Sequence, residues 1–123
     1  MNELPEHFDL LSGASEVEAE LGYWPSFHDA EIIEICIRTQ GISEIKVRPV
    51  KQEAPKRKTQ DVIVVLQIAE IESLNLTGFY SQNIILELTI TANRDGFHID
   101  IDGTVGLSGQ ITAKQISVKL LAD

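Results

Sequence analysis

From residue 31 onward, apolar and polar residues alternate along most of the chain, which is the period-two pattern of β-strands. The segments with this pattern are 31–38, 44–48, 73–77, 83–92, 97–102 and 110–121. Residues 62–69 (VIVVLQIA) are apolar on both faces, which is typical of a central strand covered on both sides. In the alternating segments, these side chains should share the apolar face of the sheet: Ile33, Ile35 and Ile37; Ile45 and Val47; Ile84, Leu86, Leu88 and Ile90; and Phe97, Ile99 and Ile101.

Two further signals locate a turn and a bulge. The string NRDG at residues 93–96 has the residue types of a tight hairpin turn. In the last segment the apolar phase changes by one residue between Ala113 and Ile116, which predicts a β-bulge near Lys114. Residues 68–74 (IAEIESL) contain good helix formers, so this segment could end a strand or begin a turn.

The N-terminal part has a different pattern. Residues 16–21 (EVEAEL) are good helix formers and Gly22 is a natural stop, so we expect a short helix with Ser12 or Ser15 as its N-cap. Residues 49–60 hold two prolines and many charges but few apolar residues, which predicts a mobile loop.

Together these elements predict a mostly β (α+β) fold with six or seven strands and a short N-terminal helix. Because the connections are short, neighbouring strands should be antiparallel. The strands should form a sandwich or a curled sheet, with the helix packed on one face or end. We expect a single domain over residues 1–123, with helical and turn structure in 1–30 and strands in 31–123.

The net charge of −9 is unevenly distributed. Residues 1–34 contain nine acidic residues and no Lys or Arg, whereas residues 46–58 carry six of the ten basic residues. Such an acidic chain repels phosphate backbones, which argues against a nucleic-acid binder, and it attracts a basic partner. The alternative that the acidity only maintains solubility stays open.

Other features of the sequence favour a cytoplasmic protein. No segment reaches the ~18–20 apolar residues of a membrane helix, so we expect no membrane contact. Residues 1–11 lack the features of a secretory signal, and the single cysteine, Cys36, fits a reducing compartment.

The string GYWPSFHDAE at residues 22–31 gathers the only Trp with a Tyr and a Phe at the junction between helix and first strand. Trp24 and Phe27 could anchor the helix on the sheet or contact a partner. His28 beside Asp29 could be a general base with an orienting carboxylate, or a pair of metal ligands. Adjacent strand residues point to opposite faces, however, so a histidine hydrogen-bonded within a turn is the simpler interpretation.

A second cluster, His98, Asp100 and Asp102, has the spacing that places all three side chains on the outer face of one strand. This row could coordinate a cation, bind Arg or Lys of a partner, or be a solvated face. If it lay close to His28 and Asp29, a small metal-dependent hydrolase using both clusters would be conceivable. The common cofactor and hydrolase motifs are missing, so we expect no enzyme, no metal and no cofactor.

The string LGYWPSFHDAEI at residues 21–32 resembles the signature of the Imm50 family, whose members are predicted immunity proteins of bacterial polymorphic toxin systems. The core WPSFHDAE is the specific part. Residues 96–103 (GFHIDIDG) and the final strand are similar to that family's C-terminal half, so the resemblance spans most of the chain. It implies a cytosolic protein that binds and blocks a cognate toxin.

Many toxins of such systems are nucleases with basic grooves, so an acidic inhibitor would compete with nucleic acid there. We therefore expect a toxin partner, with the chain as monomer or homodimer. A structural or assembly domain with an exposed β-edge is a further possibility. The predicted partner-binding residues are Glu16, Glu18, Glu20, Trp24, Phe27, His28, Asp29, Glu31, Asp100 and Asp102.

Overall fold

The computed structural model describes residues 11–50, 62–93 and 95–122, which form one helix and six strands. Their bounds are α1 (Ala14–Leu21), β1 (Glu31–Cys36), β2 (Ile42–Arg48), β3 (Val62–Thr77), β4 (Ile84–Asn93), β5 (Gly96–Val105) and β6 (Ser108–Ala122). The predicted mobile loop at 49–60 lies outside the described residues from residue 51 onward. In the described part of the chain, no helix has the length and the apolar run that crossing a bilayer requires.

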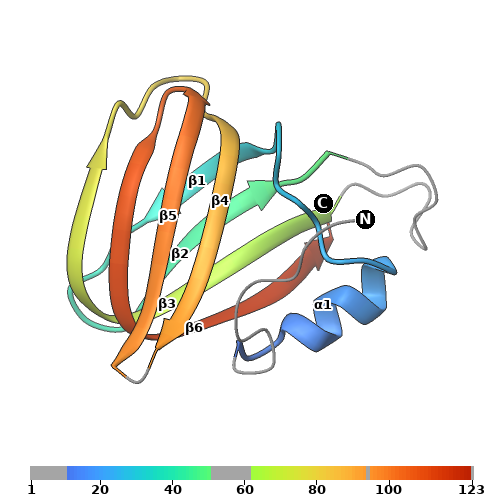
Figure 1. Ribbon diagram of the computed structural model, residues 1–123, viewed down its shortest axis with the longest axis horizontal. Helices are drawn as coiled ribbons and strands as arrows, with labels where there is room; N and C mark the ends of the chain where they lie inside the picture. Colours follow the sequence, from blue (N-terminus) through green and yellow to red (C-terminus); the bar gives the residue numbers. More distant parts are fainter. Residues whose placement is uncertain (1–10, 51–61, 94, 123) are drawn as a thin grey trace.

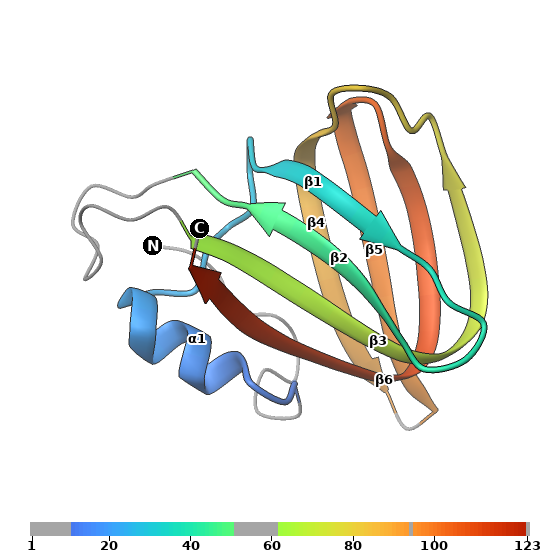
Figure 2. The same cartoon turned by 180° about the vertical axis from the view of Figure 1, so that it is seen from behind.

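The strands form one antiparallel sheet in the order β1-β2-β3-β6-β5-β4, which closes into a barrel (Figures 1 and 2). The mostly β class is therefore confirmed, and the curled sheet, not the sandwich, is the arrangement found. The seam between β1 and β4 is short, with Glu31 opposite Ile84 as its ladder pair. β3 and β6 are the longest strands and pair from Val62↔Ala122 to Thr77↔Ser108.

The core lies inside the barrel and extends to the helix. Of the inward positions predicted on β2 and β5, Ile45, Val47, Ile99 and Ile101 are buried, whereas Phe97 is half-buried against the core. β3 is buried on both faces over Ile63–Leu66, as its apolar sequence predicts. From α1, the buried residues Ala14, Val17 and Leu21 join the same apolar cluster as the barrel interior.

Helix α1 packs against β6 (Figure 1). The predicted C-terminal stop is confirmed, since Gly22 has φ 92° and donates its backbone N–H to the Glu18 carbonyl oxygen at 2.8 Å. The predicted cap by Ser12 or Ser15 is wrong. The N-cap is Gly13, because helix and strand approach so closely there that a Cβ at Gly13 would overlap the Val118 carbonyl oxygen.

This close approach predicts that Gly13→Ala lowers the free energy of unfolding by about 1–3 kcal/mol more than Gly41→Ala. Both glycines are left-handed, with φ of 87° and 90°, so the conformational strain of an added Cβ is common to the two variants. Nothing lies within 4 Å of a Cβ at Gly41, whereas Gly13 meets backbone. Urea denaturation of both variants measures the difference, and equal losses would contradict the tight seating of α1 on β6.

Irregular register explains where the apolar pattern misled. On β1 the register shifts between Ile32 and Glu34, so Ile32 faces the core, while Ile33 is half-buried and Ile37 is exposed. On β4 it shifts between Ile84 and Ile85 and again between Ile85 and Glu87. There the buried residue is Ile85, and Leu86, predicted to face inward, is 45% exposed.

The phase change predicted near Lys114 is present, since Ala113 and Ile116 are both buried. The extra residue lies on the partner strand, because the β3–β6 register shifts between Ile71 and Ser73 of β3. Residues 68–74 are strand throughout. Glu70, between the ladder pairs Ala69↔Gln115 and Ile71↔Ala113, has φ 57°, which marks the bend at which both strands change their buried face.

Candidate functional site

Residues 24–31, which we call the closure segment, join α1 to β1 and complete the barrel wall. Trp24 and Phe27 are 4% and 3% exposed and meet edge-to-face, with ring centroids 5.9 Å apart. Their burial fits the anchoring role, one of the two that the sequence left open for them. Pro25 between them is buried too, so little of this half of the segment faces solvent.

The second half of the closure segment is strained and hydrogen-bonded to β4. Phe27 and Asp29 have φ of 64° and 65°, a conformation that non-glycine residues rarely adopt. It lets the Asp29 N–H donate to the Ile85 carbonyl oxygen, and the Ile85 N–H donate to the Ala30 carbonyl oxygen, both at 2.8 Å. Together with the Ile32 N–H bond to the Asn83 carbonyl oxygen at 2.9 Å, these bonds close the seam.

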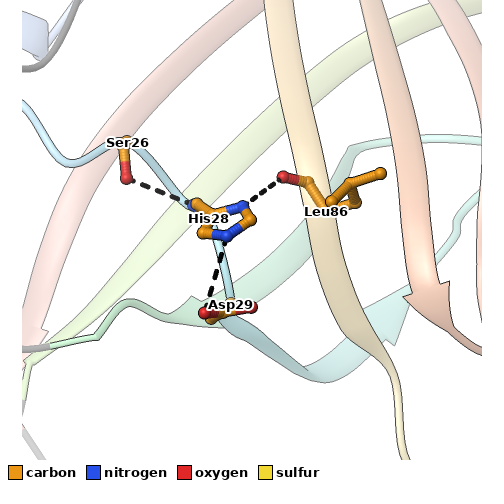
Figure 3. Close-up of polar contacts among 4 residues, drawn as sticks. All are labelled: Ser26, His28, Asp29 and Leu86. Atoms are coloured by element: carbon orange, nitrogen blue, oxygen red, sulfur yellow. Dashed lines mark hydrogen bonds and ion pairs between the residues drawn. The ribbon is translucent and has the colours of Figure 1, made fainter.

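His28 lies within this turn and fastens it to the irregular part of β4 (Figure 3). Its Nδ1 is 2.9 Å from the Leu86 carbonyl oxygen, and because a carbonyl only accepts, Nδ1 carries the proton. The Leu86 side chain points away from the ring while its carbonyl points toward it (Figure 3). The His28 backbone N–H donates to Ser26 Oγ at 3.3 Å.

The exposed chemistry of the closure segment is the pair His28 and Asp29, whose side chains are 58% and 62% exposed. Nε2 of His28 lies 3.6 Å from Oδ2 of Asp29, an ion pair when the ring is protonated. A small surface pocket of about 180 Å³ adjoins them, with Pro49 and Val50 on its other wall.

The row on β5 lies as predicted on the outer face of the barrel. Asp100 and Asp102 are exposed, and His98 is half-buried with Nδ1 3.2 Å from Thr112 Oγ1. Among the described residues, no three His, Cys, Asp or Glu side chains are grouped as metal ligands. The two clusters invoked for a hydrolase are therefore not gathered into one site by this part of the chain.

Glu31 belongs to a neutralised face formed by β1 and β2. It pairs with Arg48 at 3.5 Å, and Glu34 beside it pairs with Lys46 at 2.9 Å. The hydrogen bond to Glu34, followed by the charge of that carboxylate, raises the pKa of Lys46 above its usual value. Carboxylates that already hold a cation attract a further cation less strongly.

The remaining predicted acids lie on α1, where Glu16 and Glu20 are exposed and Glu18 is half-buried. The predicted binding residues thus fall into three groups, on α1, in the closure segment and on β5. The closure segment and β5 lie on either side of β4, and the role of the predicted residues as partner contacts stays a prediction.

Sequence reasoning overlooked four residues that the structure brings forward. Glu87 lies opposite Asp102 in the β4–β5 ladder, which extends the acidic row to a second strand. Phe79 and Tyr80, in the β3–β4 connection, are 65% and 64% exposed. Asn83, only 4% exposed, holds that connection through its side-chain amide.

Comparison with known proteins places the chain by its sequence. No curated protein and no solved structure matches it. The sequence model of one family, described as immunity protein 50, matches residues 13–121, which include α1, the closure segment, β1–β5 and all of β6 except its last residue. The chain therefore belongs to the Imm50 family.

Proposed function

We propose that this chain is a bacterial immunity protein that neutralises a cognate toxin by binding it directly in the cytoplasm. The family match over residues 13–121 carries this proposal, because it spans nearly the whole described fold. The net charge of −9 supports a basic toxin surface as the target, as in a nuclease groove.

The outer face of β4 and β5 supports the same reading. Glu87, Asp100 and Asp102 are exposed, and none of them forms an ion pair within the described parts of the chain. Glu87 and Asp102 are direct cross-strand neighbours, a like-charge arrangement that costs stability in the free protein. An Arg or Lys from a partner relieves the repulsion between these two carboxylates. Binding is therefore favoured at a position where the free protein is less stable than it could be.

Stoichiometry separates such a binder from an enzyme. Co-expression with the toxin domain encoded beside it should restore growth only while the immunity protein is at least equimolar with toxin. The purified pair should elute as a complex on size-exclusion chromatography. Protection at a small fraction of the toxin concentration would indicate turnover and contradict the proposal.

The charge argument has its own measurement. Electrostatically steered association slows with ionic strength, so the association rate constant should fall by about 10-fold or more between 50 and 500 mM NaCl. An association rate constant that is independent of salt would contradict the proposal that the toxin surface is basic. The absence of any complex would contradict the proposal that the chain binds a toxin.

A further inference from the structure

The β3–β4 connection, residues 78–83, carries the two most exposed large apolar side chains of the described chain, Phe79 and Tyr80. We call this connection the aromatic loop. It lies at the end of the barrel that is uppermost in both views, whereas α1 lies low and to one side (Figures 1 and 2). Exposed aromatic pairs are uncommon on free surfaces and are the side chains that dominate binding energy at protein interfaces.

Asn83, the last residue of the aromatic loop, fixes the conformation of the loop through its side-chain amide. The Oδ1 of Asn83 accepts the Tyr80 N–H at 3.1 Å and the Leu107 N–H at 3.0 Å, and its Nδ2 donates to the Tyr80 carbonyl oxygen at 2.8 Å. The backbone at Gly78 also packs against Gly106: a Cβ added at Gly78 would lie 2.7 Å from the Gly106 carbonyl oxygen. A loop fixed in this way loses little conformational entropy on binding.

Apolar and acidic groups adjoin at this end of the barrel. Val105, 39% exposed, pairs with Ile84 in the ladder next to the loop. Asp102 lies three residues before Val105 on the same strand, a separation of about 10 Å along an extended backbone. The acidic row of Glu87, Asp100 and Asp102 therefore begins about 10 Å along the strands from the end of the barrel that carries the aromatic loop.

This juxtaposition selects among possible occupants. A second copy docked by a two-fold axis would bring the acidic row against itself. A membrane surface or a nucleic acid carries negative charge and is repelled likewise. A basic protein surface, with Arg or Lys around an apolar pocket, matches both the rings and the carboxylates.

We infer that the aromatic loop and the adjoining acidic row form the surface that contacts the cognate toxin, with Phe79 and Tyr80 as the anchors. The inference rests on the proposed function, and it names the contact face that the function needs. Phe79 and Tyr80 insert into an apolar recess of the toxin, and Glu87, Asp100 and Asp102 bind cations at its rim.

The test uses isothermal titration calorimetry to measure how tightly this chain binds the toxin domain encoded beside it, in a catalytically inactivated form. Phe79→Ala and Tyr80→Ala should each raise the dissociation constant of the complex by about 30-fold, the range expected of interface anchors. Ile37→Ala and Ile42→Ala are the matched controls, because these side chains are 44% and 47% exposed at the β1–β2 hairpin, and they should change it less than 2-fold.

A second arm tests the acidic row separately. The triple variant Glu87→Gln, Asp100→Asn and Asp102→Asn should slow association and flatten its dependence on salt, while its thermal unfolding stays as high as that of the wild type or rises. All substituted side chains are exposed, so circular dichroism should show an intact fold.

The outcomes separate the two proposals. If the wild type binds and the Phe79 and Tyr80 variants bind equally well, the contact face is elsewhere, whereas the proposed function stands. If sedimentation shows a dimer that Tyr80→Ala dissociates, the loop is a self-association surface and the inference fails. A wild type without affinity for the toxin overturns the proposed function itself.

Discussion

Replacing Trp24 with alanine is expected to lower the free energy of unfolding by about 3–5 kcal/mol, a large part of the ~5–15 kcal/mol that stabilises a domain. The indole is 4% exposed and packs edge-to-face on Phe27 in the core shared by α1 and the barrel. Its removal opens a cavity next to Phe27, one of the two positive-φ residues of the turn around His28. Chemical denaturation followed by circular dichroism measures the loss.

Two variants calibrate this result. Trp24→Phe keeps an aromatic ring against Phe27 and should recover part of the loss. Phe79→Ala removes a ring that is 65% exposed and should change stability by less than about 0.5 kcal/mol. A loss below ~1 kcal/mol for Trp24→Ala would show that the ring does not support the core, and it would restore the partner-contact role that the sequence allowed.

The strands of the barrel could be predicted because their signal is local. Alternation predicts the inward Ile99 and Ile101 and the outward Asp100 and Asp102, and the structure confirms these four positions. The turn at residues 93–96 also fixes the register between β4 and β5. A two-residue loop pairs Asn93 with Gly96, and counting back along the ladder then places Glu87 opposite Asp102, as observed.

The errors have a common physical origin in contacts distant along the chain. Nothing local in the sequence of β4 shows that Ile85 faces inward and Leu86 outward. These orientations occur where Asp29 donates to the Ile85 carbonyl oxygen and His28 donates to the Leu86 carbonyl oxygen. Both bonds join residues more than fifty positions apart in the chain. The Gly13 cap likewise reflects the approach of β6, which local capping preferences do not contain.

The aromatic loop escaped prediction for a related reason. Phe79 and Tyr80 lie in a connection without periodicity, where the sequence alone does not distinguish exposed from buried rings. The family resemblance pointed to the closure segment, whose aromatic half is buried. A recognisable motif can therefore mark what completes the fold, while the surface available to a partner lies on an unremarkable loop.

Asn83→Ala should be nearly as costly as the loss of Trp24. It leaves the Tyr80 N–H, the Tyr80 carbonyl and the Leu107 N–H without the amide that satisfies them. The bond to Leu107 is buried and the two bonds to Tyr80 are partly buried, so at about 1–3 kcal/mol for a fully buried group left unsatisfied, a total loss of about 2–4 kcal/mol is expected. Gln82→Ala, at an exposed neighbour, is the matched control and should stay within ~0.5 kcal/mol of the wild type.

Asn83→Ala also releases the aromatic loop, so its effect on toxin affinity should exceed that of Gln82→Ala even at temperatures where both variants remain folded. Asn83→Asp separates the contributions of the amide, because a carboxylate still accepts the two N–H groups but repels the Tyr80 carbonyl oxygen. Hydrogen exchange at the amides of Tyr80 and Leu107 reports the release directly: fast in Asn83→Ala, and slower in Asn83→Asp. Equal protection of both amides in the wild type and in Asn83→Ala would show that the loop is ordered by other contacts, and the rigidity on which its binding role depends would need another cause.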